Sequence, residues 1–299
     1  MSAVEEDDTI KVLCCASCGI AGVDDITLRD CSACHLVKYC GVKCQKEHRS
    51  KHKKECKKRA AELRDELLFK QPESSHHGDC PICCLPLPLD NRKSGLYSCC
   101  SKQICIGCHY ANNKRERAER LQHKCAFCRE PFPKEEEKNE LRMKRIAVND
   151  PVAISHMGTI KSNEGDYKAA FEYWARAAKL GNLEAHYSLA LMYARGDGLE
   201  KNQKKVLHHL EEAAIGGNPS ARHSLGFIEE QCGRMDRAAK HFIIAAKLGH
   251  DKSLKCVKDL YQAGYVSKDD FAATLRGYQA AISATMSSQR EEGYEFFGI

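Results

Sequence analysis

Residues 31–56 read CSACHLVKYCGVKCQKEHRSKHKKEC, a run in which cysteines and one histidine recur in pairs. Cys40 with Cys44, and His52 with Cys56, are four residues apart and can each share one face of a helical turn. A pair with two intervening residues instead suits a tight turn. With one such pair upstream, the N-terminal region offers eight metal ligands: Cys15 and Cys18, Cys31 and Cys34, Cys40 and Cys44, His52 and Cys56.

Cysteine usage across the chain indicates zinc. The sequence has 299 residues and 19 cysteines, of which all but Cys232 and Cys256 lie between Cys14 and Cys128. The N-terminus MSAVEEDDTI lacks the basic and apolar regions of a signal peptide, and no window is apolar enough for a membrane span. We therefore expect a cytoplasmic or nuclear protein, in which paired cysteines hold metal and do not form disulfides. Thiolates in tetrahedral arrays favour zinc.

A second cysteine cluster covers residues 80–128. Its four pairs are Cys80 and Cys83, Cys99 and Cys100, Cys105 and Cys108, Cys125 and Cys128. Two adjacent cysteines strain a common tetrahedron, so His109 or His123 remains an alternative to one of the second pair. Together the two clusters predict about four zinc ions, two in each module.

The order and spacing of the first cluster resemble those of a MYND finger. The resemblance implies a cross-braced module, in which ligand pairs alternate along the chain between two zinc ions. One ion then takes Cys15, Cys18, Cys40 and Cys44, and the other takes Cys31, Cys34, His52 and Cys56. Similar fingers bind proline-rich peptides with a Gln after the sixth ligand and a nearby Trp. Here Gln45 is present, but Arg49 stands where the Trp is expected.

The second cluster resembles an all-cysteine RING finger. The resemblance implies one zinc held by Cys80, Cys83, Cys105 and Cys108, and another held by Cys99, Cys100, Cys125 and Cys128. In RING-type ubiquitin ligases such a module recruits a ubiquitin-conjugating enzyme. An aliphatic residue between the first two ligands and a proline after the last one make the groove for this enzyme, and a cation directly after the last ligand holds the donor ubiquitin. Ile82, Arg129 and Pro131 occupy those places.

The C-terminal half repeats itself. Residues 177–182 (AAKLGN) recur as 213–218 (AAIGGN) and again as 245–250 (AAKLGH), 36 and then 32 residues later. A period in this range, with small residues at fixed places, is typical of stacked helix pairs. Asp166 is placed to cap a helix that ends near Gly181. The pattern over residues 150–286 resembles Sel-one-like repeats, with Ser267 opening a terminal helix from Phe271 to Met286.

The expected fold class is therefore two small cross-braced zinc-binding modules followed by an all-α helical-repeat solenoid. The expected domains are a MYND-type finger (14–56), a basic helical connector and linker (57–79), a RING-type finger (80–133) and the repeats with their capping helix (150–286).

Two functions follow from this organisation. The first is a RING-type ubiquitin ligase whose repeats hold a substrate protein, and the second is a non-enzymatic scaffold. The basic run from Lys43 to Arg64 contains no aromatic residue for base stacking, so we expect a solvated helix face there and not nucleic-acid binding. Repeats fill the chain after Pro151, leaving no room for the cofactor domain of a methyltransferase. We expect protein partners, no membrane and no catalytic side chain.

Overall fold

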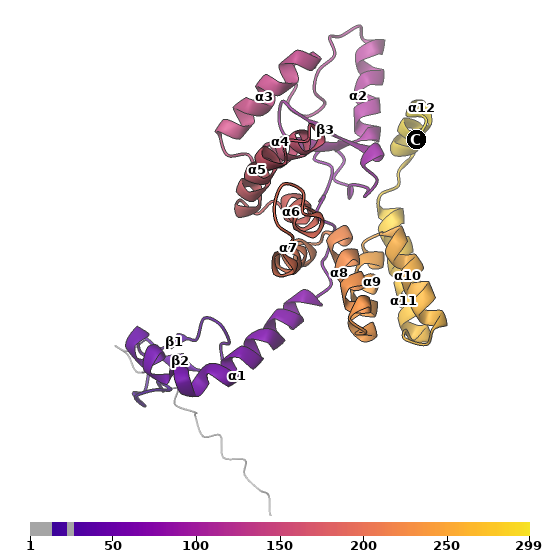
Figure 1. Ribbon diagram of the computed structural model, residues 1–299. Coiled ribbons are helices and arrows are strands. Elements are labelled where there is room, and N and C mark those ends of the chain that lie inside the picture. Colours follow the sequence, from indigo (N-terminus) through magenta and orange to yellow (C-terminus); the bar gives the residue numbers. More distant parts are fainter. Residues whose placement is uncertain (1–13, 23–26) are drawn as a thin grey trace, which may run out of the picture. The chain divides into compact units, whose positions relative to one another are not determined.

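The computed structural model describes residues 14–22 and 27–299 (Figure 1). The chain folds into two compact units, Met1–Leu68 and Phe69–Ile299, and each is described separately below. Among the described residues, no helix has both the length and the apolar character that crossing a membrane requires.

Over residues 14–22 and 27–68, which the structure describes, the first unit has very little apolar core. Strand β1 (Arg29–Asp30) pairs antiparallel with β2 (Lys38–Tyr39), and helix α1 (Val42–Leu68) follows. Its buried core consists of Cys15, Cys31, Cys34 and Tyr39. Because the cysteine sulfurs themselves form most of this core, we expect the unit to need bound metal to stay folded. Helix α1 continues without a break beyond Cys56, so the expected connector is an extension of the finger's own helix.

The second zinc module opens the second unit. After the short helix η1 (Asn91–Lys93), β3 (Ser94–Tyr97) and β4 (Lys102–Cys105) form an antiparallel hairpin in which Ser94 faces Cys105. Helix α2 (Ile106–Ala118) starts directly after the hairpin, and the Cys105 side chain caps it by accepting a hydrogen bond from the Cys108 backbone N–H.

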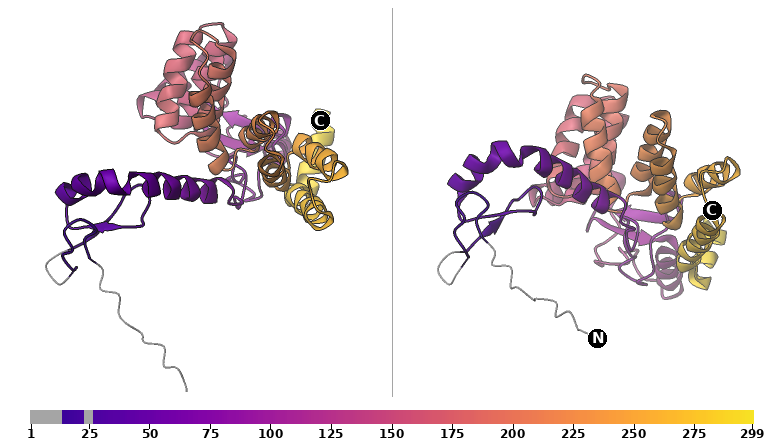
Figure 2. Two further views of the ribbon diagram at one scale, coloured as in Figure 1. Left: turned by 60° about the horizontal axis from the view of Figure 1, so that its bottom comes forward. Right: turned by 90° about the horizontal axis from the view of Figure 1, so that it is seen from below.

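Helices make up the rest of the second unit, which confirms the expected solenoid. They are α3 (Glu135–Ala147), α4 (Pro151–Asn163), α5 (Tyr167–Lys179), α6 (Leu183–Arg195), α7 (Gln203–Ile215), α8 (Pro219–Gln231), α9 (Met235–Lys247), α10 (Asp251–Gln262), α11 (Lys268–Ala284) and α12 (Ser288–Phe297). Helices α4 to α11 pack as successive pairs, each against the next (Figure 2). The predicted caps are present: Asp166 accepts from Ala169 N, and Ser267 accepts from Asp270 N.

The chain's last helix was not expected. Helix α11 ends at Ala284, and α12 then packs against α2 of the second zinc module, beside which Figure 1 draws it. The two ends of the second unit are thereby joined.

Residues 71–78, the last part of the expected connector and linker (57–79), pack on the repeats. The His76 backbone N–H donates to the Gly217 carbonyl (3.1 Å), and His76 Nε2 lies 3.0 Å from Glu184 Oε2. Burial raises the pKa of Glu184, but hydrogen bonds from His76 and Asn218 outweigh it, and the net pKa is lowered. Glu184 of α6, together with Gly217 and Asn218 just before α8, therefore holds this segment.

Candidate metal centres

Four sets of cysteine and histidine side chains converge in the structure. In each set the four ligand atoms lie within 4.8 Å of one another: Cys15, Cys18, Cys40 and Cys44; Cys31, Cys34, His52 and Cys56; Cys80, Cys83, Cys105 and Cys108; Cys99, Cys100, Cys125 and Cys128. These are the four sets that the two family resemblances imply. Each set supplies four protein ligands, which is the number that a closed structural zinc site requires.

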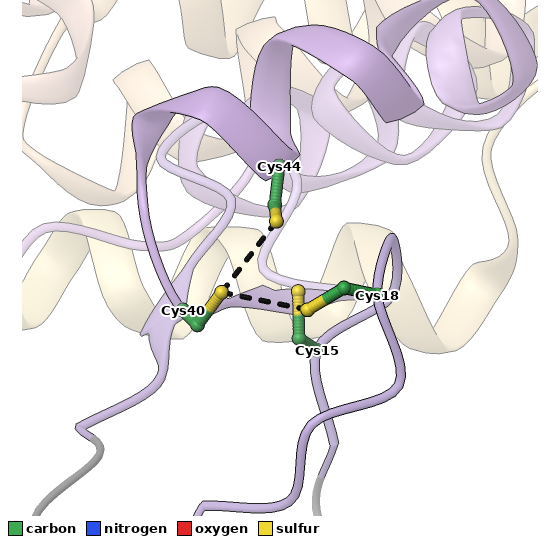
Figure 3. Close-up of side chains that lie close together, drawn as sticks. All are labelled: Cys15, Cys18, Cys40 and Cys44. Atoms are coloured by element: carbon green, nitrogen blue, oxygen red, sulfur yellow. Dashed lines mark hydrogen bonds between the residues drawn. The ribbon is translucent and has the colours of Figure 1, made fainter.

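The first set is drawn in Figure 3. Cys15 and Cys18 come from one loop, Cys40 follows β2, and Cys44 lies in the first turn of α1, with the sulfurs directed toward one another. The Sγ atoms of Cys18 and Cys40 are 3.6 Å apart, and those of Cys40 and Cys44 are 3.5 Å apart. Because α1 starts at Val42, Cys40 precedes the helix and does not share a helical turn with Cys44 as the spacing predicted.

The thiol pKa values in the first set indicate that a cation would stabilise it. Hydrogen bonds from the backbone N–H groups of Cys18 and Cys40 lower the pKa of Cys15 to about 6. The interaction with Cys44, followed by those with the other sulfurs, raises the pKa of Cys40 to about 12. Cys15 therefore ionises readily to a thiolate, whereas the neighbouring Cys40 resists ionisation. A divalent metal offsets this repulsion and allows all four sulfurs to bind as thiolates.

The second set contains His52, the one histidine that the spacing predicted to be a ligand. His52 is only 5% exposed, and its Nε2 lies 3.1 Å from Cys34 Sγ. His48, one turn earlier on α1, instead places Nδ1 3.1 Å from the hydroxyl of the buried Tyr39. The two histidines are stacked, yet only His52 reaches the sulfurs.

In the fourth set the structure brings the two adjacent cysteines, and neither alternative histidine, together with the last pair. Both Cys99 and Cys100 belong to it, with Sγ atoms 3.4 Å from Cys128 and 3.9 Å from Cys125, respectively. The two histidines have other partners. His109 is hydrogen-bonded through Nδ1 to the Tyr97 hydroxyl and through Nε2 to Asn113, while His123 binds the buried Glu116 at 2.8 Å.

Four of the five C-x-x-C pairs adopt one local turn, whereas the fifth, Cys105 with Cys108, begins helix α2. The residue after the second cysteine has a positive φ, and its backbone N–H donates to the carbonyl of the first cysteine. These residues are Gly19 (φ 74°), His35 (55°), Cys84 (56°) and Arg129 (65°), with hydrogen bonds of 2.9, 3.0, 2.9 and 3.1 Å. Only glycine adopts this conformation without strain. Cysteine spacing predicted the pairs, but nothing in it indicated that Cys84 and Arg129 carry this backbone strain.

The three residues that the RING resemblance assigns to an enzyme contact are exposed. Ile82 is 41% exposed, and Arg129 and Pro131 are exposed as well. Arg129 Nη1 donates to Asn112 Oδ1 at 2.9 Å, which holds the guanidinium against α2. On the first finger Arg49 is exposed at the place of the expected Trp, and Gln45 is partly buried.

Comparison with known families identifies two of the three parts. The MYND finger profile matches residues 15–56, and the Sel1 repeat profile matches residues 156–182, 183–218 and 235–250. The chain thus carries a MYND-type zinc finger, further cysteine clusters suited to zinc, and Sel1 repeats. For residues 80–128 the assignment of zinc sites depends on the geometry of the cysteine sets. The resemblance of this module to a RING finger is limited to the order and spacing of the ligands.

The curated relatives share only short stretches. Chitin synthase regulatory factor 4 of Schizosaccharomyces pombe is 31% identical over 84 residues, which is 28% of this chain and 13% of the relative. The Drosophila melanogaster cytochrome c oxidase assembly factor 7 homolog is 50% identical over 41 residues, 14% of this chain and 15% of the relative. The chain therefore spans less than a sixth of either relative.

Two solved structures are similar to part of the chain. A protective antigen of uropathogenic Escherichia coli with an SLR fold gives a TM-score of 0.41 at 22% identity, covering 48% of this chain and 33% of the antigen. A Sel1 repeat protein of Oxalobacter formigenes gives 0.38 at 24% identity, covering 41% of this chain and 98% of that protein.

Proposed function

We propose that the chain is a zinc-stabilised adaptor whose helical repeats bind a protein partner. The observation that carries this proposal is that each metal set contributes four protein ligands. Such closed sites leave no position for a substrate, so their zinc ions shape loops and do not perform chemistry. Stacked helical repeats provide extended surfaces that suit protein partners. The relatives' names, a regulatory factor and an assembly factor, agree with this role.

A candidate anchor point on the repeats is Phe227. This α8 side chain is 43% exposed, and its ring is held by His223 and Phe242, with centroids 4.7 and 5.4 Å away. A rigid, half-exposed aromatic ring is the kind of side chain that dominates protein interfaces. Phe227→Ala should therefore reduce partner binding without unfolding the repeats.

The test is quantitative cross-linking mass spectrometry on the tagged full chain. Partners that bind the repeats should cross-link to α4–α11 and be recovered less well with Phe227→Ala. Met143→Ala is the matched control, because Met143 is 48% exposed but lies on α3, before the repeats. A partner set that is unaffected by Phe227→Ala and cross-links only outside α4–α11 would contradict the repeat-based adaptor.

A second candidate function is RING-type ubiquitin ligase activity. The observation that favours it is the alternating pairing of residues 80–128 together with the exposure of Ile82, Arg129 and Pro131. In this proposal the module holds a conjugating enzyme so that a substrate lysine attacks the ubiquitin thioester and the enzyme's thiolate leaves. Catalysis then comes from positioning, and no side chain of this chain forms a covalent intermediate.

Ubiquitin discharge from a panel of conjugating enzymes tests the ligase. Ile82→Ala should abolish enzyme binding, with Leu121→Ala as control because Leu121 is a similarly exposed apolar residue of the module. Arg129→Ala should leave enzyme binding unchanged but slow ubiquitin discharge. Its control is Arg92→Ala, which removes a surface partner of Asp90 and should change neither. Wild-type protein that discharges no enzyme of the panel supports the scaffold function alone.

We also propose that the chain works in the cytosol or nucleus, because sixteen ligands, nearly all of them thiolates, need a reducing environment. Fractionation of cells expressing the full chain, followed by thiol alkylation, tests this proposal.

A further inference from the structure

The C-terminal helix α12 lies directly on the second zinc module. Two buried glycines meet where α12 crosses α2: a β-carbon on Gly107 would lie 2.8 Å from Arg290 Cα, and one on Gly293 would lie 3.1 Å from Gly107 Cα. Side chains would hold these backbones apart, so the glycines set the close approach. Around the crossing, Phe296 packs on Tyr110 and Lys93 lies over the ring of Tyr294.

Arg290 is buried at this contact and points at the zinc ligands. It is only 1% exposed. Its Nη1 donates to the carbonyls of Pro86 and Thr285, both at 2.7 Å. Its Nη2 donates to the Leu85 carbonyl at 3.1 Å and to Cys83 Sγ at 3.4 Å. The guanidinium thus fixes the loop that carries Cys83 and also contacts the sulfur itself.

A second side chain of α12 reaches the same metal set. Gln289 Nε2 donates to Cys108 Sγ at 3.5 Å. Two of the four ligands in the set of Cys80, Cys83, Cys105 and Cys108 therefore accept hydrogen bonds from residues 181 and 207 positions away in the sequence.

The charge of this site explains why such contacts matter. Four thiolates around one Zn²⁺ leave two uncompensated negative charges, and three of these cysteines are buried. A buried charge is costly unless it is paired and hydrogen-bonded. Arg290 supplies a positive charge and charge-assisted hydrogen bonds, and donors of this kind strengthen metal sites from outside the ligand set.

We infer that Arg290 and Gln289 complete the zinc site of Cys80, Cys83, Cys105 and Cys108 from the C-terminal helix, so that zinc retention at this site and docking of α12 depend on each other. The dependence runs both ways, because a coupling free energy between two binding events is reciprocal. Loss of this zinc releases α12 and uncovers the face of α2 around Gly107 and Tyr110. Undocking of α12 loosens this zinc and not the other three.

Zinc release from the full-length, zinc-loaded protein to a chromogenic chelator tests the inference. In Arg290→Gln one of the four ions should leave about 10-fold to 100-fold faster, the range seen when partners of metal ligands are removed. Gly293→Val leaves every hydrogen-bonding side chain in place but adds atoms at the helix crossing, and it should accelerate the same ion. Glu292→Gln is the control, because it breaks only the exposed pair of α12 with Lys114 (3.2 Å) and should change nothing.

Alkylation during partial chelation identifies the ion that leaves. Peptide mapping should show Cys80, Cys83, Cys105 and Cys108 modified first in both variants, while the other sets stay protected. Hydrogen exchange supplies the reciprocal measurement: removing this zinc from wild-type protein should speed exchange in Ser288–Phe297 but not in α8 or α9.

Three outcomes would overturn the inference. The first is that all four zinc ions leave both variants at the wild-type rate. The second is that the cysteines of the set of Cys99, Cys100, Cys125 and Cys128 are alkylated first. The third is loss of helicity, by circular dichroism, together with loss of every zinc ion of the second unit, which would make Arg290 a general core residue. Arg290→Lys separates charge from geometry, because it keeps the cation but loses the forked donors and should give intermediate release.

Discussion

Gly158 of α4 lies against the indole of Trp174 on α5, where a β-carbon on the glycine would be 2.6 Å from Trp174 Cδ1. The same arrangement recurs at Gly226, whose β-carbon would lie 2.5 Å from Phe242. In the middle repeat the equivalent positions hold Ala190 and the smaller Leu210. Glycine on one helix is thus paired with a large aromatic side chain on the next helix, and alanine is paired with the smaller leucine.

Gly158→Ala should destabilise the repeats by about 1–3 kcal/mol, the usual effect of an added methyl in a packed core. Denaturant unfolding followed by helical circular dichroism measures the change. Trp174→Leu alone should also destabilise, but the two changes together should cost less than their sum, because the pair then resembles Ala190 and Leu210. Strict additivity would show that the two residues are not in tight contact.

The sequence contains enough information for the parts whose determinants are local. Ligand pairs lie within a few residues, and caps such as Asp166 and Ser267 act within one helical turn. The repeat period likewise needs only neighbouring units. These features therefore indicated the ligand pairs and the solenoid directly, whereas the grouping of the pairs into sets came from the family resemblances.

The missed features depend on residues far apart in the sequence. The SQREEGYEFF segment of α12 has no local sign that Arg290 contacts Cys83, 207 positions away. His76 and Glu184 are likewise 108 positions apart. A usable signal did exist, since a glycine inside a helix such as Gly107 or Gly293 usually has a packing reason. Which element such a glycine packs against is decided by the tertiary fold, and no local pattern encodes it.

Gly217 should be essential for holding the segment from Phe69 to Gly78 on the repeats. It has φ +89°, and a β-carbon there would lie 2.7 Å from the Ser74 carbonyl oxygen. Gly217→Ala should therefore displace the segment and speed its hydrogen exchange. Gly181 is a matched control in the preceding repeat, because it has φ +83° but a β-carbon there would meet nothing within 4 Å. Gly181→Ala should cost backbone strain alone, so equal exchange in both variants would contradict the tight contact.

Cys84→Gly should stabilise the first turn of the second zinc module. Cys84 is exposed, lies outside the metal sets and has φ 56°, a conformation that costs a non-glycine residue about 1–2 kcal/mol. The greater freedom of glycine in the unfolded chain offsets part of the gain. Slower hydrogen exchange at the amide of residue 84, with four zinc ions retained, is the expected result. Cys84→Val should do the opposite, since β-branching worsens the strain.

The repeats should lose stability as the pH falls from 7 toward 5. Burial, followed by repulsion from His186 and His208, lowers the pKa of His209 to about 4. Below about pH 6.5 a histidine of the unfolded chain takes up a proton, whereas His209 of the folded protein stays neutral. The contribution of His209 to the unfolding free energy is therefore complete above about pH 6.5 and is lost between about pH 6.5 and pH 4. At pH 6.0 the loss from this residue is about 1 kcal/mol or less. His209→Gln should reduce the difference in unfolding free energy between pH 7.5 and 6.0, and an unchanged difference would show that His209 titrates normally.

His52→Ala should remove one zinc ion from the first finger. The imidazole is buried, and its Nε2 lies 3.1 Å from Cys34 Sγ, so the substitution leaves a set of three ligands. Structural zinc requires four, and elemental analysis should fall from about four ions per chain to about three. The core of this unit is mostly cysteine, so the loss should also make residues 14–68 sensitive to protease.

His48→Ala is the control, because His48 is stacked on His52 at 5.8 Å but binds Tyr39, and it should keep all the zinc. Full zinc in His52→Ala, or loss of an ion in His48→Ala, would reverse the assignment of the histidine ligand. The repeats in the second unit should remain helical in both variants.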